Sequence, residues 1–166
     1  MEEYNSQNSF KTYRLSPHWL QYVINQLPWL IICLCGFLFA GDDTLPYRSY
    51  ILIASMGLMV YLLYLAIDMK RIEYVITGEQ LIYKHGVLFH TADFMELYRI
   101  VDYQEHRTPM QQIIGLKNVT LLSGDRSRPR LTMTGIRSSS RILEEIRTRV
   151  EYNKKRRGIY EITNRF

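Results

Sequence analysis

The chain has 166 residues, of which 47% are hydrophobic, and it carries a net charge of +5. Once a hydrophobic hairpin is set aside, this length leaves one domain of roughly 100 residues. The charge is uneven: residues 1–67 hold three basic and four acidic residues, whereas residues 68–166 hold 18 and 12. Cys33 and Cys35 lie too close along a helix to bridge each other, and the late start of the first apolar run argues against a secretory signal.

Two long apolar stretches dominate the first half of the chain. Leu27–Ala40 and Tyr50–Ile67 are separated only by Gly41–Ser49, and the second stretch contains no charged residue. A helix over that second stretch spans about 27 Å, close to the roughly 30 Å of a bilayer's hydrocarbon core. We therefore predict a transmembrane hairpin. Its predicted extent is residues 16–69, with helices at about residues 17–40 and 46–69.

The residues that flank this hairpin predict its start and its orientation. Ser16 and Pro17 form a helix start signal, and the polar residues 1–15 are expected to be irregular or interfacial. Basic residues precede and follow the hairpin, whereas its turn carries Asp42 and Asp43. The positive-inside rule therefore predicts that both termini are cytoplasmic. The predicted membrane-interface residues, which include two aromatic ones, are Lys11, Arg14, Trp19, Tyr22, Lys70 and Arg71.

Polar and small residues inside the first apolar helix carry further predictions. Pro28 removes one backbone hydrogen bond and predicts a kink. Asn25 and Gln26 either satisfy the freed backbone groups or mark headgroup depth. Gly36 and Ala40 form a pair of small residues four positions apart, which lets another helix approach closely.

The hydrophobic period changes at Ile72, where apolar and polar residues begin to alternate as they do in β-strands. Gly78 and Glu79 are predicted to link the first two strands in a type II′ turn, and Gly86 to mark a bulge or bend. Thr108–Gly115 is expected to be a loop or helical turn. A seventh short strand fits the pattern without a definite position. The predicted strands are Ile72–Ile76, Gln80–Leu88, Phe94–Leu97, Ile100–Glu105, Asn118–Leu122 and Leu131–Thr134.

The last predicted element is an amphipathic helix that Ser138–Ser140 would cap. Oppositely charged residues four positions apart, such as Glu145 and Arg149, are expected to pair on its exposed side. Its apolar stripe consists of Ile142, Leu143, Ile146 and Val150. We therefore predict that residues 70–152 fold as one domain on their own and that residues 153–166 form a basic tail.

Strands closed by one amphipathic helix are the outline of a pleckstrin-homology-like (PH-like) barrel. Residues 50–150 resemble the bacterial membrane-anchored PH-like family, long catalogued as a domain of unknown function. The resemblance implies a membrane α-helical hairpin followed by a mainly β PH-like barrel or sandwich that a C-terminal α-helix closes. It also implies a membrane-tethered scaffold and carries over no catalytic residue. The matching segments are Tyr74–Thr77, Leu81–Tyr83, Gly86, Leu97, Arg99–Val101, Met110–Gly115, Leu131 and Gly135–Ile136.

Residues able to perform chemistry are sparse, and we expect no enzyme activity, cofactor or metal site. Asp102, Glu105 and His106 resemble a catalytic cluster, but strand alternation places Glu105 on the other face. The histidines lack the spacing of metal ligands. PH domains that bind phosphoinositides have basic residues in their first hairpin loop. Here that turn, Thr77–Gln80, is acidic.

Two basic groups are the candidate contacts for an anionic partner. A solvated loop and the preference of helix C-termini for cations explain both groups, and contact with anionic lipid or an acidic protein is the alternative. Nucleic acid is not expected, because no aromatic residues interleave with the arginines. The candidates are Arg126, Arg128, Arg130, Lys154, Lys155, Arg156 and Arg157.

These features favour a membrane-anchored scaffold that recruits or assembles protein partners, including copies of itself, at the cytoplasmic face of the bacterial inner membrane. Such a barrel leaves a sheet edge near its closing helix, where an extended peptide can add a strand. An anionic-lipid surface sensor and a small accessory subunit of a membrane transport or secretion complex are the alternatives.

Overall fold

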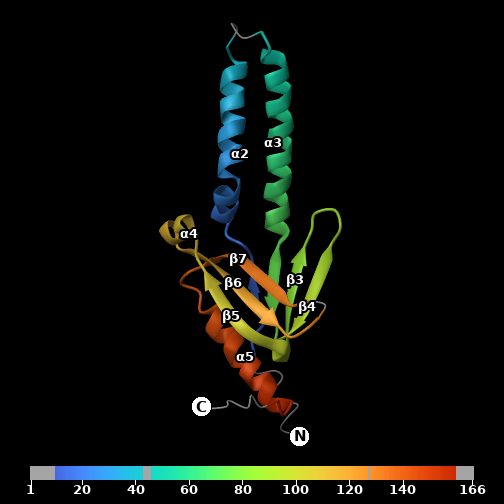
Figure 1. Ribbon diagram of the computed structural model, residues 1–166. Helices are drawn as coiled ribbons and strands as arrows, with labels where there is room; N and C mark the ends of the chain where they lie inside the picture. The colour runs from blue at the N-terminus through green and yellow to red at the C-terminus, as the bar shows by residue number, and fades with distance from the viewer. Residues whose placement is uncertain (1–9, 43–45, 127, 160–166) are drawn as a thin grey trace.

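The computed structural model describes residues 10–42, 46–126 and 128–159. Two long helices, α2 and α3, stand above a β domain that α5 closes (Figure 1). The elements are β1 (Tyr13–Leu15), α2 (Trp19–Ala40), α3 (Arg48–Arg71), β2 (Glu73–Ile76), β3 (Gln80–His85), β4 (Thr91–Glu96), η2 (Leu97–Arg99), β5 (Ile100–His106), α4 (Pro109–Ile114), β6 (Leu116–Ser123), β7 (Arg130–Arg137) and α5 (Ile142–Arg156).

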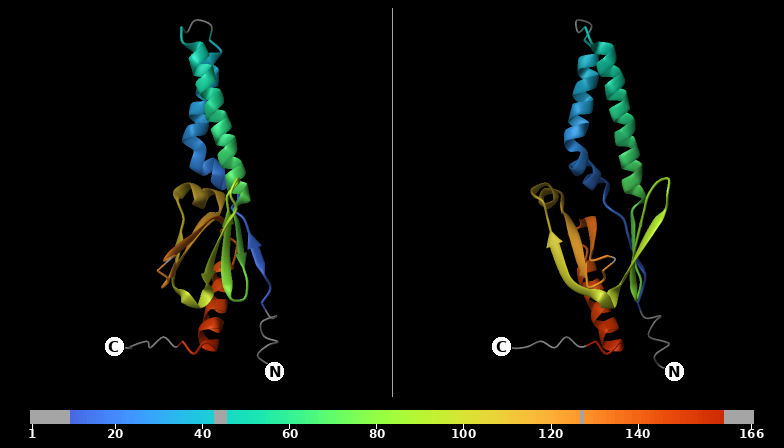
Figure 2. Two further views of the ribbon diagram at one scale, coloured as in Figure 1. Left: turned by 90° about the vertical axis from the view of Figure 1, so that its right-hand side faces the viewer. Right: turned by 45° about the vertical axis from the view of Figure 1, so that its right-hand side comes forward.

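The strands form two antiparallel sheets, as the PH-like outline predicts. One sheet has four strands in the order β1-β2-β3-β4, and the other has three in the order β5-β6-β7. The sheets face each other with the core between them, and α5 runs along one open side (Figures 1 and 2). The predicted fold class, a helical hairpin followed by a mainly β domain and a C-terminal helix, is therefore confirmed.

The missing seventh strand lies before the helical hairpin. Tyr13–Leu15 form β1, which pairs antiparallel with β2 so that Leu15 lies opposite Tyr74 and Tyr13 opposite Ile76. The expectation that residues up to 15 are irregular or interfacial was wrong for these three residues. The helical hairpin is consequently an insertion between two paired strands of one sheet.

The start of the first helix also differs from the prediction. Helix α2 begins at Trp19, and His18 is its N-cap, with its side chain accepting from the backbone N–H of Leu20. Ser16 and Pro17 instead belong to the link from β1. The backbone N–H of His18 donates to the carbonyl of Gly135 in β7 at 2.9 Å, which orients this link along the barrel.

Helices α2 and α3 are both long and apolar enough to cross a membrane. Only 11% of the apolar 18-residue stretch in each helix is buried, whereas a core helix of a soluble domain is mostly buried. Pro28 lies inside α2, as predicted. A Cβ on Gly36 would come within 2.2 Å of the Ser55 Oγ, so this glycine permits the close approach of α3. These exposed apolar surfaces indicate association with a membrane.

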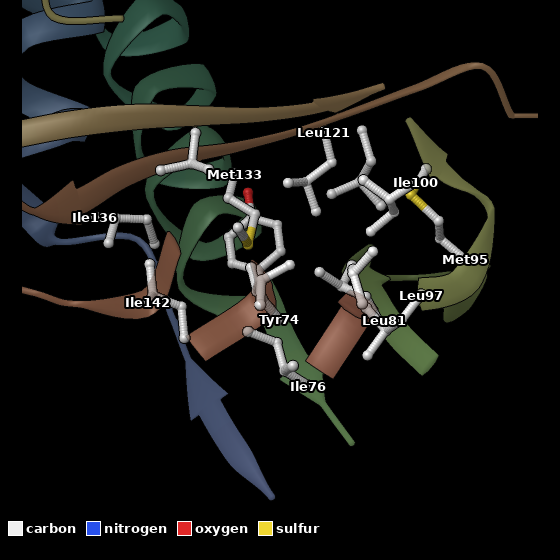
Figure 3. Packing of buried hydrophobic residues seen from close by; sticks show 14 residues of the cluster. Tyr74, Ile76, Leu81, Met95, Leu97, Ile100, Leu121, Met133, Ile136 and Ile142 are labelled. Atoms are coloured by element: carbon white, nitrogen blue, oxygen red, sulfur yellow. The ribbon is translucent and has the colours of Figure 1, made fainter. Parts of the chain in front are cut away.

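The domain core joins residues from both sheets and α5. Figure 3 shows Tyr74 and Leu81 of the first sheet pointing toward Leu121 and Met133 of the second. Ile146 of α5 closes the core and is fully buried. The buried cluster comprises Tyr74, Ile76, Leu81, Met95, Leu97, Ile100, Val119, Leu121, Leu131, Met133, Ile136, Ile142, Ile146 and Val150.

Two predicted turns differ in detail. Gly78 and Glu79 do form the two-residue link between β2 and β3, since Ile76 pairs with Leu81 and the Thr77 N–H donates to the Gln80 carbonyl. The link is not a type II′ turn, because Gly78 does not have the positive φ that this turn requires. Gly86 has a φ of 102° and starts the β3–β4 turn, so β3 ends at His85 and not at Leu88.

Helix α5 has the predicted apolar stripe but a different cap and one unexpected buried charge. Arg141 is the N-cap and makes no side-chain capping bond, so the predicted serine cap was wrong. Arg149 is only 1% exposed, although the sequence placed it on the solvent side. Its guanidinium donates to the carbonyls of Lys11, Ile76 and Thr77. This arginine therefore fastens the segment before β1 and the end of β2 to α5.

Burial has an electrostatic cost at this arginine. Removal from water lowers the pKa of the Arg149 guanidinium, and the nearby Glu145 carboxylate, 3.8 Å away, opposes that shift. The rings of Phe10 and Tyr13 lie 5.3 and 5.0 Å from the guanidinium carbon and add cation–π contacts. The charge is thus held by carbonyl oxygens and aromatic faces.

Candidate interaction site beside β5

The open edge of the second sheet lies next to α5. Within the part of the chain that the structure describes, strand β5 pairs only with β6, and its outer edge borders a cavity of about 430 Å³ shared with α5. Val101 and Val150 supply apolar surface there. We name this cavity the β5–α5 groove. Its lining residues are Val101, Asp102, Tyr103, Arg147, Val150, Glu151, Lys154, Lys155 and Ile159.

Local structure explains why the edge is open at this point. The register of β5 on β6 shifts between Ile100 and Asp102, so Val101 is the extra residue of a bulge and is 65% exposed. The Tyr103 N–H donates to the Asp102 Oδ1 at 2.7 Å, a local bond beside the bulge. The bulge and this local bond keep the edge from templating uncontrolled pairing.

Charge in the groove is mixed, with three basic and two acidic side chains. Arg147 lies over the Tyr103 ring, with its guanidinium carbon 5.6 Å from the ring centroid. Lys154 and Lys155 line the end of the groove near the C-terminus of α5, while Asp102 and Glu151 supply the acidic side chains. The arrangement suits an extended segment that carries apolar side chains and acidic groups.

The structure divides the predicted basic tail of α5 between two surfaces. Lys154 and Lys155 face the groove, whereas Arg156 pairs with Glu79 at 2.8 Å. The Arg157 guanidinium carbon lies 3.9 Å from the centroid of the Tyr98 ring. The last two arginines therefore fasten the end of α5 to the β2–β3 turn and to η2.

The three arginines predicted as one basic loop lie elsewhere on the domain. Arg126 and Arg128 belong to the link between β6 and β7, and Arg130 begins β7. Arg128 pairs with Asp93 of β4, which joins the two sheets at this end. None of the three lines the β5–α5 groove.

The predicted membrane-interface residues lie at the base of the helical hairpin, in β1 and just before β1. Trp19, Tyr22 and Lys70 line a cavity of about 300 Å³ between the first turn of α2 and the last turn of α3. Arg71 ends α3. Arg14 lies in β1 and contacts Glu73 at 3.5 Å, and the carbonyl of Lys11 accepts from Arg149.

A buried polar network, missed by the sequence analysis, joins the hairpin to the domain. The Gln111 Nε2 of α4 donates to Gln21 of α2 and to Asn118 of β6, both at 2.8 Å. Gln21 in turn donates to Asn25 at 2.8 Å. A Cβ on Gly135 would come within 2.8 Å of the Gln21 Cβ, so the glycine permits this contact. Asn25 therefore has a partner in the protein and does more than mark headgroup depth.

The capping chemistry of α4 positions Gln111. Thr108 accepts from the Gln111 backbone N–H, and the Gln111 Oε1 accepts from the Thr108 N–H, which makes a capping box. Pro109 begins the helix, and Gly115, with a φ of 74°, ends it. The sequence T-P-x-Q-x-x-x-G contains these signals, and they would have placed the helix.

Replacing Gln111 with leucine should loosen the hairpin on the domain. The change leaves the buried Gln21 Oε1 without its donor and removes the bond from the Thr108 N–H to the Gln111 Oε1, which costs about 2 kcal/mol of folding free energy. Thermal unfolding of the full chain in mild detergent measures the loss. Gln112→Leu is the matched control, because Gln112 is exposed and its replacement should change the midpoint little. Equal midpoints for the two variants would contradict a joining role for the network.

The cluster that resembled a catalytic site is held in structural contacts. Glu105 binds Arg107 and Lys117, and the hydrogen bond from Arg107 is the main cause of its lowered pKa. Asp102 accepts from the Tyr103 N–H, and His106 is exposed. Within residues 10–42, 46–126 and 128–159, no three His, Cys, Asp or Glu side chains are placed to share a metal ion.

Fold and surface together define a PH-like module joined to a helical hairpin able to cross a membrane. The family model described as Bacterial PH domain matches residues 22–150. The chain therefore belongs to the bacterial PH domain family. Neither the curated proteins nor the solved structures give a match. PH-like domains are typically interaction modules without catalytic activity.

Proposed function

We propose that this protein is a membrane-anchored, non-enzymatic PH-like scaffold that holds a protein partner at the cytoplasmic face of the bacterial inner membrane. The observation that carries the proposal is the β5–α5 groove, where an unpaired strand edge lies beside apolar and basic side chains. An extended segment can add to such an edge through main-chain hydrogen bonds while the groove selects its side chains. A second copy of the chain is one such partner.

The anchor itself favours a protein partner over a lipid ligand in the groove. Two membrane-spanning helices hold the domain far more tightly than a basic patch would. The β1–β2 connection, the first hairpin loop of a PH barrel, is occupied by the helical hairpin. The acidic Thr77–Gln80 turn links β2 to β3 and is therefore the second loop of the barrel, not the first loop that phosphoinositide-binding PH domains use.

Crosslinking from within the groove tests the proposal. A photoreactive amino acid in place of Val101, in the full chain in its native membrane, should give discrete protein adducts that persist at about 0.3 M salt, where surface charge is strongly screened. Charge reversal of Lys154 and Lys155 to glutamate should reduce these adducts several-fold. Arg126→Glu with Arg130→Glu changes the charge equally outside the groove and should leave them intact.

The outcomes separate the competing functions. Lipid adducts from position 101 that resist salt, without protein adducts, would favour the anionic-lipid sensor. Protein adducts that depend on Arg126 and Arg130, but not on the two lysines, would move the partner site to the β6–β7 link. Adducts to subunits of one transport or secretion complex from hairpin positions alone would favour the accessory-subunit alternative.

Orientation in the membrane gives an independent prediction. Lys70 and Arg71 lie in the last turn of α3, so the positive-inside rule predicts that the domain is in the cytoplasm. In a chain with Cys33→Ala and Cys35→Ala, a cysteine replacing the exposed Tyr47 should react with an impermeant maleimide applied from the periplasmic side. A cysteine replacing Glu144 of α5 should react only after the membrane is opened. The reverse labelling pattern would refute the topology.

A further inference from the structure

Two parts of the domain surface have inverted polarity: apolar side chains are exposed where polar ones would be expected. The β3–β4 turn carries Leu88 and Phe89, which are 77% and 85% exposed, where turns usually carry polar residues. In α4 the only buried residue is Gln111, whereas Ile113 is 82% exposed. Apolar side chains this exposed are unfavourable in water, so both surfaces are expected to contact something other than water.

Both inverted surfaces lie at the end of the domain from which the helical hairpin emerges. Figure 1 and the right view of Figure 2 show α4 on one side of the base of the hairpin and the β3–β4 turn on the other, and the left view of Figure 2 shows both near the level of that base. The hydrogen bond between Gln111 and Gln21 fixes α4 at the level of the first turns of α2. The plane through these two surfaces therefore crosses the base of the hairpin.

We propose that the β3–β4 turn and the outer face of α4 insert into the cytoplasmic headgroup layer of the bilayer that the hairpin spans. The proposal rests on the membrane anchoring proposed above and adds the posture of the domain. The occupant is a lipid surface because the two apolar surfaces lie on opposite sides of the hairpin, and a bilayer meets both at once. The inserted residues are Leu88, Phe89, Met110, Ile113 and Ile114.

Charge around these surfaces suits an anionic lipid leaflet. Arg71, Lys84, His85 and His90 gather with Glu73 around a cavity of about 210 Å³ at the base of the β3–β4 turn. Glu73 also pairs with Lys84 at 3.5 Å. Arg107 precedes α4. Apolar side chains flanked by basic ones are the composition of an interfacial anchor.

This arrangement orients the β5–α5 groove relative to the membrane. With the hairpin and two insertion points in one plane, the domain is held in a single posture and does not swing on its link. Helix α5 then runs away from the membrane surface, as Figure 1 shows relative to the hairpin. The groove stays accessible to a cytoplasmic segment along its whole length.

Spin labels on the full chain test the insertion. Cysteines replace Phe89, Ile113, Leu63 or Phe94 one at a time, with Cys33 and Cys35 as alanine, in vesicles of three parts phosphatidylethanolamine to one part phosphatidylglycerol. Leu63 of α3 is the lipid reference, and Phe94 of β4, an exposed apolar residue of the same β-hairpin, is the water reference. Labels at positions 89 and 113 should show higher oxygen and lower nickel-chelate accessibility than position 94, shifted toward the values at position 63.

Each of the other outcomes contradicts either the insertion or the membrane anchoring on which the insertion rests. Position 63 in lipid with positions 89 and 113 as water-accessible as position 94 would overturn the insertion and leave the anchoring intact. Position 63 in water would refute the anchoring itself. Dipolar broadening at positions 89 or 113 that vanishes when labelled chains are diluted with unlabelled ones would assign these surfaces to a second copy.

Discussion

A fragment of residues 70–152 should fail to fold stably, whereas a chain in which Asn-Gly replaces residues 17–72 should fold as a soluble domain. The fragment lacks β1, so β2 loses its outer neighbour and Arg149 loses the carbonyl of Lys11. Tyr13 and Leu15 no longer cover the core. We expect the free energy of unfolding to fall by about 5 kcal/mol, which is a large part of the total stability of a small domain.

The linked chain, also ended at Tyr152 so that both lack the last residues of α5, tests whether β1 is the missing part. The β1–β2 ladder ends at the pair Leu15–Tyr74, and Ser16 and Glu73 are the next residues beyond it on the two strands. Asn-Gly is the link that two-residue β-hairpins prefer. Its thermal midpoint should exceed that of the fragment by at least about 20 °C. A fragment as stable as the linked chain would show that β1 contributes little, and would restore the domain boundary that the sequence suggested.

Replacing Ile146 with aspartate should unfold the domain of the full chain. Ile146 is fully buried at the centre of the α5 stripe, and the change removes its packing and places an unpaired carboxylate in the core. The expected cost is about 4 kcal/mol or more. Limited proteolysis in mild detergent measures this loss, because the hairpin helices would keep much of the helical signal in circular dichroism.

Thr148→Asp is the matched control for that substitution. Thr148 lies on the exposed side of the same helix, two positions away, so the same new charge stays in water. Its effect should stay within about 0.5 kcal/mol. Equal resistance to protease in the two variants would mean that α5 is not packed on the barrel.

Long periodic segments were predictable from sequence, and short elements formed through distant partners were not. The 18 apolar residues Tyr50–Ile67 and the alternation from Ile72 onward each satisfy a local pattern, and both elements are present. Strand β1 has only three residues, and its pairing with β2 spans the whole helical hairpin. A strand this short shows no hydrophobic period of its own, and it forms only because it pairs with a strand that is distant in sequence.

The candidate site shows the same division. The open edge beside the closing helix follows from the PH-like outline, and Lys154 and Lys155 were predicted by their charge. Arg149 was assigned to the solvent side because the spacing to Glu145 matched an exposed ion pair. Only the carbonyls that converge on its guanidinium from β2 and from the segment before β1 explain why a charge is buried there.

With the hairpin spanning the membrane as proposed above, the insertion of two helices between paired strands makes barrel formation depend on how the helices enter the bilayer. The ribosome delivers β1 first, and its partner β2 follows only after both helices have been synthesised. If one helix alone crossed the bilayer, β1 and β2 would lie on opposite sides and their ladder would not form. A completed barrel therefore excludes chains in which only one helix crossed, and such misinserted chains expose unpaired strand edges that cellular proteases can recognise.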